Sequence, residues 1–217
     1  STSEVYGMSP DKNFNEYSSS LVVGPVHKSR WIYSCSKQLL DRVIIAYGEH
    51  GDLDYTLFRP FNWIGPKLDS LEQAQLGNGR VLPIFIHNLL HNKDIVLVGG
   101  GKQKRCLTWL DEGIEALVKI IYNEKDELNG KIFNIGNPQN NISIKELAEL
   151  LIDEYNKLYP NKFKGKLVTE TQENFYGKGY EDIPVRVPDI HEANKFLNWI
   201  PQVGVRETVQ KTLQSFI

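Results

Sequence analysis

A tyrosine and a lysine stand four positions apart in the segment YSCSK, as Tyr33 and Lys37. Apolar residues recur at helical spacing around them, and positions i and i+4 share one face of a helix, so both side chains are expected to point the same way. The ammonium would favour the phenolate, and a tyrosine with its ordinary pKa of about 10 needs this help to take a proton from an alcohol at neutral pH. The pair suits general-base catalysis. The spacing alone also allows a boundary tyrosine beside a solvated lysine.

Tyr33 and Lys37 are positioned by a chain in which predicted helices and strands alternate. The patterns predict helices over residues 31–51, from 81 onward and over 111–122, and strands at 53–61, 94–100 and 131–136. Ser143 and Glu146 form a Ser-x-x-Glu capping box, which predicts a further helix start. This alternation favours an α/β fold with a Rossmann-like, doubly wound parallel sheet, followed by a small C-terminal lobe.

The glycine-rich turn of a nucleotide-binding sheet is not found in the sequence, since neither GxGxxG nor GxxGxxG occurs. The chain begins with STSEVYG, a segment expected at a strand end, with no strand pattern before it. We therefore expect the later part of a longer protein. Residues 1–65 would be the C-terminal part of the Rossmann domain and residues 66–217 mainly a substrate-binding lobe, with residues 105–136 as the candidate for a return to the sheet.

Composition excludes several classes of protein. The 217 residues carry 25 Lys and Arg against 27 Asp and Glu, so there is no basic excess for nucleic acid. No apolar run approaches the roughly 20 residues that span a bilayer, and the N-terminus has no signal-peptide layout. Two cysteines, Cys35 and Cys106, do not indicate a disulfide framework. We expect a cytoplasmic protein without a nucleic-acid or membrane partner.

For two further groups of side chains, the sequence favours a packing role over a chemical one. His87 and His91 are four positions apart on an expected helix, but no acidic or cysteine third ligand stands near them, so no metal is expected. Cys35 lies between Tyr33 and Lys37 in sequence but on another side of the helix, where it is expected to pack.

Several segments together resemble a known family. STSEVYG, YSCSK, RPFNWIGP, GGGKQKR and FNIGNP occur in the order found in the extended short-chain dehydrogenases, the nucleotide-sugar epimerases, dehydratases and decarboxylases. GPVHKSRWIYSCSKQLLDRVIIAYGE, RPFNWIGPKLD and FYGKGYEDIPVRVPDI are most similar to the UDP-glucuronate decarboxylase (dehydrogenase) domains of polymyxin resistance, which serve aminoarabinose modification of lipid A. The resemblance covers essentially the whole chain.

The resemblance implies NAD as cofactor and a defined reaction on UDP-glucuronate. Tyr33, assisted by Lys37 and hydrogen-bonded through Thr2, would remove the proton of the sugar 4-hydroxyl as hydride passes to the nicotinamide. The carboxylate on C5 is then β to a ketone, so CO2 leaves with its electrons delocalised and UDP-4-keto-pentose (UDP-L-Ara4O) results. Glu4 would stand near the ring. The family assigns proton donation to Arg186, but an arginine stays protonated, so anchoring or a water relay is favoured.

The site residues implied by the resemblance fall into three sets. Those expected to be catalytic are Thr2, Glu4, Tyr33, Lys37 and Arg186, and those expected at the cofactor are Tyr33, Lys37 and Pro60. Arginine and lysine suit the diphosphate through charge-assisted bonds, although each can also be a solvated surface cation. The residues expected to bind substrate are Thr2, Ser3, Arg30, Asn62, Arg80, Val96, Leu97, Val98, Gly99, Gly100, Gly101, Lys102, Gln103, Lys104, Arg105 and Tyr180. The chain departs from the pattern at Trp109, where the family carries an acidic residue.

Other functions stay open. A UDP-xylose synthase or a nucleotide-sugar 4,6-dehydratase would keep and reuse NADH. The chain can also be an inactive fragment that binds a sugar nucleotide, and alone it is not expected to bind NAD+ tightly. The full-length protein is expected to be a homo-oligomer, with a formyltransferase domain as a candidate upstream.

Overall fold

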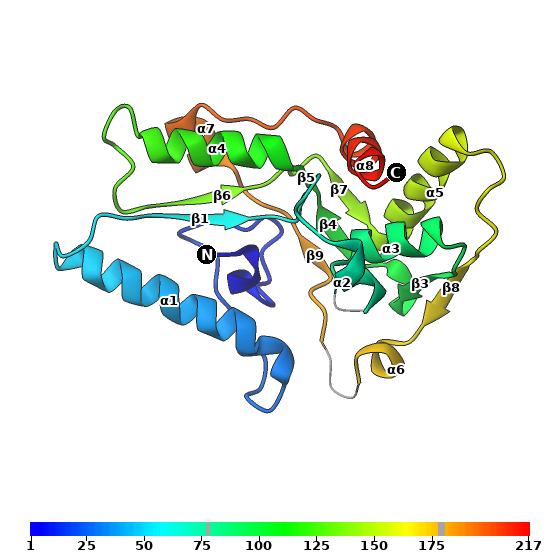
Figure 1. The fold of residues 1–217 in the computed structure, drawn as a ribbon. Coiled ribbons are helices and arrows are strands. Elements are labelled where there is room, and N and C mark those ends of the chain that lie inside the picture. Colours follow the sequence, from blue (N-terminus) through cyan, green and yellow to red (C-terminus); the bar gives the residue numbers. More distant parts are fainter. Residues whose placement is uncertain (77–78, 178–180) are drawn as a thin grey trace.

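The computed structural model describes residues 1–76, 79–177 and 181–217, and in it a pair of strands lies between two long helices (Figure 1). β1 (Thr56–Pro60) pairs in parallel with β6 (Lys131–Ile135). α4 (Leu110–Tyr122) runs along one side of the pair and α1 (Ile32–Glu49) along the other. Apolar residues of β6, α4 and α7 (His191–Leu197) form a core on the α4 side.

A second group of elements packs beside the first (Figure 1). β3 (Ile95–Val98) pairs in parallel with β8 (Leu167–Glu170), and β4 (Lys104–Cys106) lies between β7 (Asn141–Ser143) and β9 (Val185–Arg186). The core of this group is formed by α3 (Val81–Leu90), α5 (Ile144–Leu158) and α8 (Val205–Gln214) against β3. The shorter elements are β2 (Trp63–Ile64), which pairs with β5 (Thr108–Trp109), and the helices α2 (Leu71–Gln75) and α6 (Gln172–Tyr176).

The predicted α/β class with parallel pairing is confirmed, since four of the five strand pairs among the described residues are parallel. Within the described ranges the strands form four small sheets. Three of them have two strands, among them β1 with β6, and one has three strands. The capping box is also confirmed: the Ser143 hydroxyl accepts a hydrogen bond from the Glu146 amide at 3.1 Å, and the Ser143 amide donates to Glu146 Oε2 at 2.9 Å. No helix in these ranges is long and apolar enough to cross a membrane.

The division of the chain at residue 65 stays a prediction. The pairing of β6 with β1 shows how residues 105–136 can return to the first group of elements. α7 packs in the same core as α4 and β6, although the sequence pattern places its residues in the second lobe.

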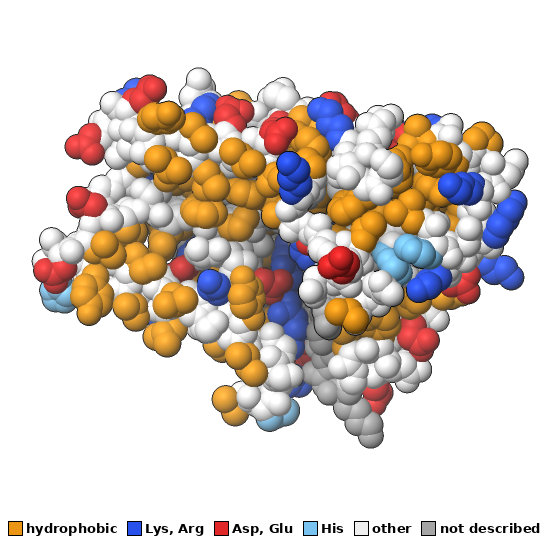
Figure 2. All heavy atoms as spheres, viewed as in Figure 1, with side chains coloured by type: hydrophobic (Ala, Val, Ile, Leu, Met, Phe, Trp, Pro, Cys, Tyr) orange, Lys and Arg blue, Asp and Glu red, His pale blue; other side chains and the backbone are white. Residues whose placement is uncertain are grey.

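α1 buries polar residues and exposes apolar ones. Its fully buried side chains are Ser34 and Asp41, whereas Leu39, Leu40, Val43 and Tyr47 are exposed. Figure 2 shows hydrophobic side chains on the surface over this helix. α1 is therefore attached to the described structure mainly through a polar stripe.

A buried carboxylate holds the loop between residues 8 and 28 on β6. Glu16 Oε1 accepts a hydrogen bond from the Asn134 amide at 2.6 Å, while Oε2 is buried without a hydrogen-bond partner among the described residues. Burial raises the pKa of Glu16 from 4.5 to about 7, and the neighbouring Asp189 and Glu192 carboxylates act in the same direction. The folded protein therefore binds the Glu16 proton more tightly than the unfolded chain does.

Glu16→Gln is expected to make the protein more stable than the wild type above pH 7. Between pH 4.5 and about 7 the folded state holds a proton that the unfolded state has released, so the free energy of unfolding of the wild type falls as pH rises through this window. The neutral amide keeps the Asn134 bond and removes this pH dependence. Urea unfolding at pH 5 and pH 8 measures it, with the exposed Glu124→Gln as control. Equal pH dependence in wild type and Glu16→Gln would contradict the assignment.

Candidate active site

The segment STSEVYG forms a short helical turn that presents its polar side chains. Thr2 caps the 3-10 helix η1 (Ser3–Tyr6), and its hydroxyl accepts a hydrogen bond from the Glu4 amide at 3.3 Å. Thr2 and Ser3 are buried, whereas Glu4 is half-buried. Val5 and Tyr6 anchor the turn in an apolar cluster with Phe14 and Phe61. The turn therefore holds three of the predicted site residues on a fixed backbone.

Tyr33 and Lys37 lie in the first two turns of α1. The Lys37 ammonium is 5.8 Å from the centroid of the Tyr33 ring, and the Tyr33 side chain is half exposed. The predicted helix and the shared face of the two side chains are confirmed. Lys37 makes no hydrogen bond or ion pair with the described residues, so its ammonium is available to a ligand. The catalytic role of the pair stays a prediction.

The turn η1 packs directly against α1. Gln38 Nε2 donates to the Val5 carbonyl at 2.7 Å, and the Ser1 hydroxyl donates to Asp41 Oδ2 at 2.8 Å. The hydrogen bond between Thr2 and Tyr33 that the resemblance implies is not among the bonds of the described residues, because the Thr2 hydroxyl faces its own turn. The two segments nevertheless lie side by side.

Glu4 stands between two arginines from distant parts of the chain. Arg30, in the 3-10 helix η2 (Ser29–Trp31), donates to Glu4 Oε2 at 2.7 Å, and Arg186 on β9 forms an ion pair with Glu4 Oε1. We call these three residues the Glu4 cluster. Burial would raise the pKa of Glu4, but Arg186 and Arg30 outweigh it and lower the pKa from 4.5. Two guanidiniums against one carboxylate leave one net positive charge.

Arg186 is itself buried, with Nε lacking a hydrogen-bond partner among the described residues. Burial lowers the pKa of Arg186 to about 10, Arg105 adds to this shift, and Glu4 opposes it. The group therefore remains cationic at neutral pH, which favours anchoring of an anion over proton donation. Arg105 lies opposite Arg186 in the β4–β9 register.

Arg105 is already engaged by the segment before β9. Its guanidinium donates to Asp182 Oδ1 at 2.7 Å and to the Ile183 carbonyl at 2.8 Å. The adjacent Glu181 forms an ion pair with Lys28 and accepts from Trp31 Nε1 at 3.0 Å. Figure 2 shows a hollow between the two halves of the molecule with lysine and arginine side chains in its depth. Sequence reasoning missed Glu181 and Asp182, because no local pattern points to partners so far along the chain.

The glycine turn at residues 99–101 follows β3 and differs from that strand in its backbone conformation. Gly99, Gly100 and Gly101 all have positive φ, of 60°, 73° and 66°, a backbone region that favours glycine. A Cβ on Gly101 would lie 2.8 Å from the Lys145 amide nitrogen, so this glycine also allows the turn to approach α5. Leu97 and Val98 are buried in β3, whereas Lys102 and Lys104 are exposed. Of the predicted ligand segment 96–105, the part after the strand is thus the accessible one.

The remaining predicted ligand residues are spread around the strand ends. Arg80 forms an ion pair with Asp69, with Nε donating to Oδ1 at 2.9 Å. Asn62 has a left-handed backbone, with φ of 43°, and donates to the Cys106 carbonyl at 3.4 Å. Pro60 is the last residue of β1. Tyr180 lies outside the described residues.

Trp109 and the pair of histidines take structural roles, whereas the packing expected for Cys35 is wrong, because this residue is exposed. Trp109 is buried, donates to Asp111 Oδ2 at 3.1 Å and lies under the Lys211 ammonium of α8. The rings of His87 and His91 stack with centroids 4.2 Å apart. In the described part of the chain, no group of three or more His, Cys, Asp or Glu side chains is arranged to hold a metal ion.

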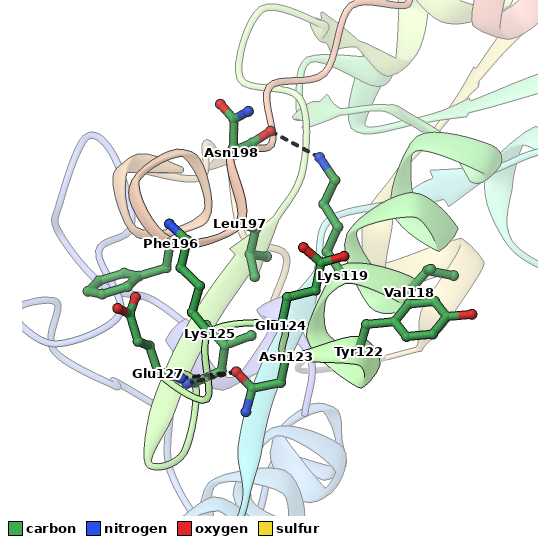
Figure 3. A pocket seen from close by; sticks show the side chains of 11 residues that line it. Val118, Lys119, Tyr122, Asn123, Glu124, Lys125, Glu127, Phe196, Leu197 and Asn198 are labelled. Atoms are coloured by element: carbon green, nitrogen blue, oxygen red, sulfur yellow. Dashed lines mark hydrogen bonds between the residues drawn. The ribbon is translucent and has the colours of Figure 1, made fainter.

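A cavity of about 480 Å³ lies elsewhere, between the C-terminal ends of α4 and α7 (Figure 3). Lys119 on its wall donates to the Asn198 carbonyl at 3.0 Å. None of the predicted catalytic or substrate residues lines this cavity. It is therefore separate from the candidate active site.

The described elements form a Rossmann-like α/β fold in which Tyr33 and Lys37 share one face of α1. The chain matches the NAD dependent epimerase/dehydratase family over residues 1–136, more than half of its length. The chain belongs to this family, and NAD is the cofactor that the family name specifies.

Solved structures support the same fold. The chain is similar to the PbgP3 protein from Burkholderia pseudomallei, with a TM-score of 0.85 and 43% identity over 100% of this chain and 61% of that one. It is similar in fold to the UDP-glucuronic acid 4-epimerase from Bacillus cereus in complex with UDP-glucuronic acid and NAD (TM-score 0.79, 20% identity, 99% and 59% covered). It is also similar in fold to the dTDP-glucose 4,6-dehydratase from Bacillus anthracis, with a TM-score of 0.77 and 21% identity over 100% of this chain and 60% of that one. The chain thus spans about three fifths of each of these three proteins.

Proposed function

We propose that the full-length protein oxidises and decarboxylates UDP-glucuronate with NAD+, yielding UDP-4-keto-pentose, CO2 and NADH. The observation that carries this proposal is the Glu4 cluster, because Arg30 and Arg186 place a net positive charge beside the turn that holds Thr2 and next to α1. A neutral sugar needs no such charge, whereas a hexuronate carries a carboxylate on C5. The resemblance of the quoted motifs supports the same substrate, and the lipid A aminoarabinose pathway is proposed on that ground.

The exposed polar atoms of α1 fit a dinucleotide. Tyr33 is half exposed, and the Lys37 ammonium has no hydrogen-bond acceptor among the described side chains, so it can donate to ribose hydroxyls. Pro60, at the end of β1, is proposed to lie beside the nicotinamide. When bound, NAD+ supplies the hydride acceptor.

The chain's own residues then have distinct tasks. Tyr33 takes the hydroxyl proton from O4 as the C4–H bond breaks with its electron pair. Arg186 and Arg30 hold the C5 carboxylate in place until the C5–CO2 bond breaks, and its electrons pass into the enolate formed with the 4-ketone. C5 then takes up one proton, which balances the proton that Tyr33 removed from O4. Thr2 and Ser3 are proposed to bind the sugar hydroxyls.

Product analysis tests the proposal. Full-length protein given UDP-glucuronate and NAD+ is expected to release NADH and CO2 in equal amounts together with a keto-pentose. Retention of NADH with a xylose or 6-deoxy product would instead assign a UDP-xylose synthase or a 4,6-dehydratase. The 217-residue chain serves as a control, since it is expected to bind NAD+ more weakly than the full-length protein in calorimetric titration. Tight binding of NAD+ by the short chain would contradict that expectation.

A further inference from the structure

The inner face of α1 is polar where the helix carries its reactive residues. Ser34 and Asp41 are the fully buried residues of this helix, and the half-buried Gln38 lies between them on the same stripe. Partly buried apolar residues, Ile44 and Ile45, join the stripe only in the later turns. The turns with Tyr33 and Lys37 are therefore attached by hydrogen bonds, with little apolar packing.

These hydrogen bonds reach both ends of the segment that carries Thr2, Ser3 and Glu4. Gln38 Nε2 donates to the Val5 carbonyl at 2.7 Å, just after this segment. Asp41 Oδ2 accepts from the Ser1 hydroxyl at 2.8 Å, just before it, and from Arg59 Nη2 on β1 at 3.2 Å. Asp41 and Arg59 are almost completely buried.

The direction of these bonds fixes how α1 is turned. Hydrogen bonds weaken steeply when their angle is lost, whereas apolar contacts have no preferred direction. Tyr33 and Lys37 share one helix, so a rotation of α1 would leave their mutual geometry intact. It would move both relative to the turn that holds Thr2 and Glu4.

We propose that Gln38 and Asp41 are positioning residues for the reaction, which hold α1 in the one rotation that brings Tyr33 onto the hydroxyl to be oxidised. The inference rests on the proposed function in assuming that a sugar hydroxyl binds between α1 and η1. Neither residue touches the reacting atoms in this assignment. Both act through Tyr33 and Lys37.

The test replaces Gln38 in the full-length protein by Met and by Glu, two side chains of similar length that cannot donate to the Val5 carbonyl. Since misplacement by about 1 Å can cost about 100-fold in rate, kcat is expected to fall by about 10- to 100-fold. KM for UDP-glucuronate is expected to change by less than about threefold, because the change spares binding of the ground state. In Gln38→Met, which adds no charge, the pH at which kcat is half-maximal should not move, since the Tyr33–Lys37 pair stays intact. Gln214→Met, exposed at the end of α8, is the matched control.

Asp41→Asn is the second variant, with the exposed Glu49→Gln at the end of α1 as its control. This change removes the counterion of the buried Arg59 and is expected to destabilise the protein. Its rates are therefore divided by the concentration of NAD+ sites, which is measured by titration. Hydrogen exchange adds a measurement that needs no turnover: amides of residues 32–37 should exchange faster in Gln38→Met, and those of residues 44–49 should not.

The outcomes separate the two proposals. Unchanged kcat in both Gln38 variants, or unchanged exchange of residues 32–37, would overturn the positioning role. A rise of KM in proportion to the loss of kcat/KM would also overturn it, because it would place Gln38 in binding. If the wild type leaves UDP-glucuronate untouched and converts another nucleotide sugar, the proposed function fails, and the Gln38 variants are then measured on that sugar.

Discussion

Tyr33→Phe is expected to lower kcat for UDP-glucuronate by about 1,000-fold, since general-base catalysis by a positioned side chain contributes about 100- to 10,000-fold. Removing one oxygen takes away the group that accepts the 4-hydroxyl proton and leaves the ring in place. KM should change by less than about tenfold, because phenylalanine loses one hydrogen bond to the 4-hydroxyl and keeps the other substrate contacts. The measurement is NADH formation by full-length protein under saturating NAD+.

The control for this variant lies on the same helix. Tyr47 is exposed near the end of α1, and Tyr47→Phe should keep wild-type kcat. A Tyr33→Phe protein with more than a tenth of wild-type kcat would remove the proposed base and with it the redox assignment of this site.

Arg186→Met is expected to lower kcat/KM by about 100- to 1,000-fold, because the C5 carboxylate loses its partner in a buried charge pair, which costs about 2 to 5 kcal/mol. The methionine leaves Glu4 paired with Arg30 alone and removes the buried positive charge that would hold the C5 carboxylate. Arg186→Lys keeps the charge but not the planar fork, so a loss of about tenfold is expected. CO2 and NADH are measured together.

Arg206→Met controls for the loss of an arginine, since Arg206 on α8 is exposed and pairs with Asp153. Thermal unfolding of each variant shows whether the protein is folded, and Arg186→Lys provides a rate if Arg186→Met does not fold. More than a third of wild-type kcat/KM in Arg186→Lys and Arg186→Met alike would contradict the anchoring role.

Local patterns were sufficient for the longer helices, for β1, β3 and β6, and for the Tyr33–Lys37 pair, but not for the short strands and helices between them. The i,i+4 spacing on a helix and the Ser143–Glu146 capping box each depend on neighbours within four positions, so sequence alone could place them. The Glu4 cluster could be placed only through resemblance, because Arg30 and Arg186 meet Glu4 by tertiary folding. The role of Gln38 had no signal at all, since a glutamine on a helix is ordinary until its partner is known.

The segment from Glu181 to Arg186 binds three elements that are far from it in sequence. Glu181 pairs with Lys28 across 153 positions, Asp182 pairs with Arg105 across 77, and Arg186 pairs with Glu4. Such distant contacts form only after most of the loop-closure entropy has been overcome. The charged hollow is therefore coupled to the rest of the fold, and a chain cut before β9 would lose Arg186 together with α7 and α8, which contribute to the two apolar cores.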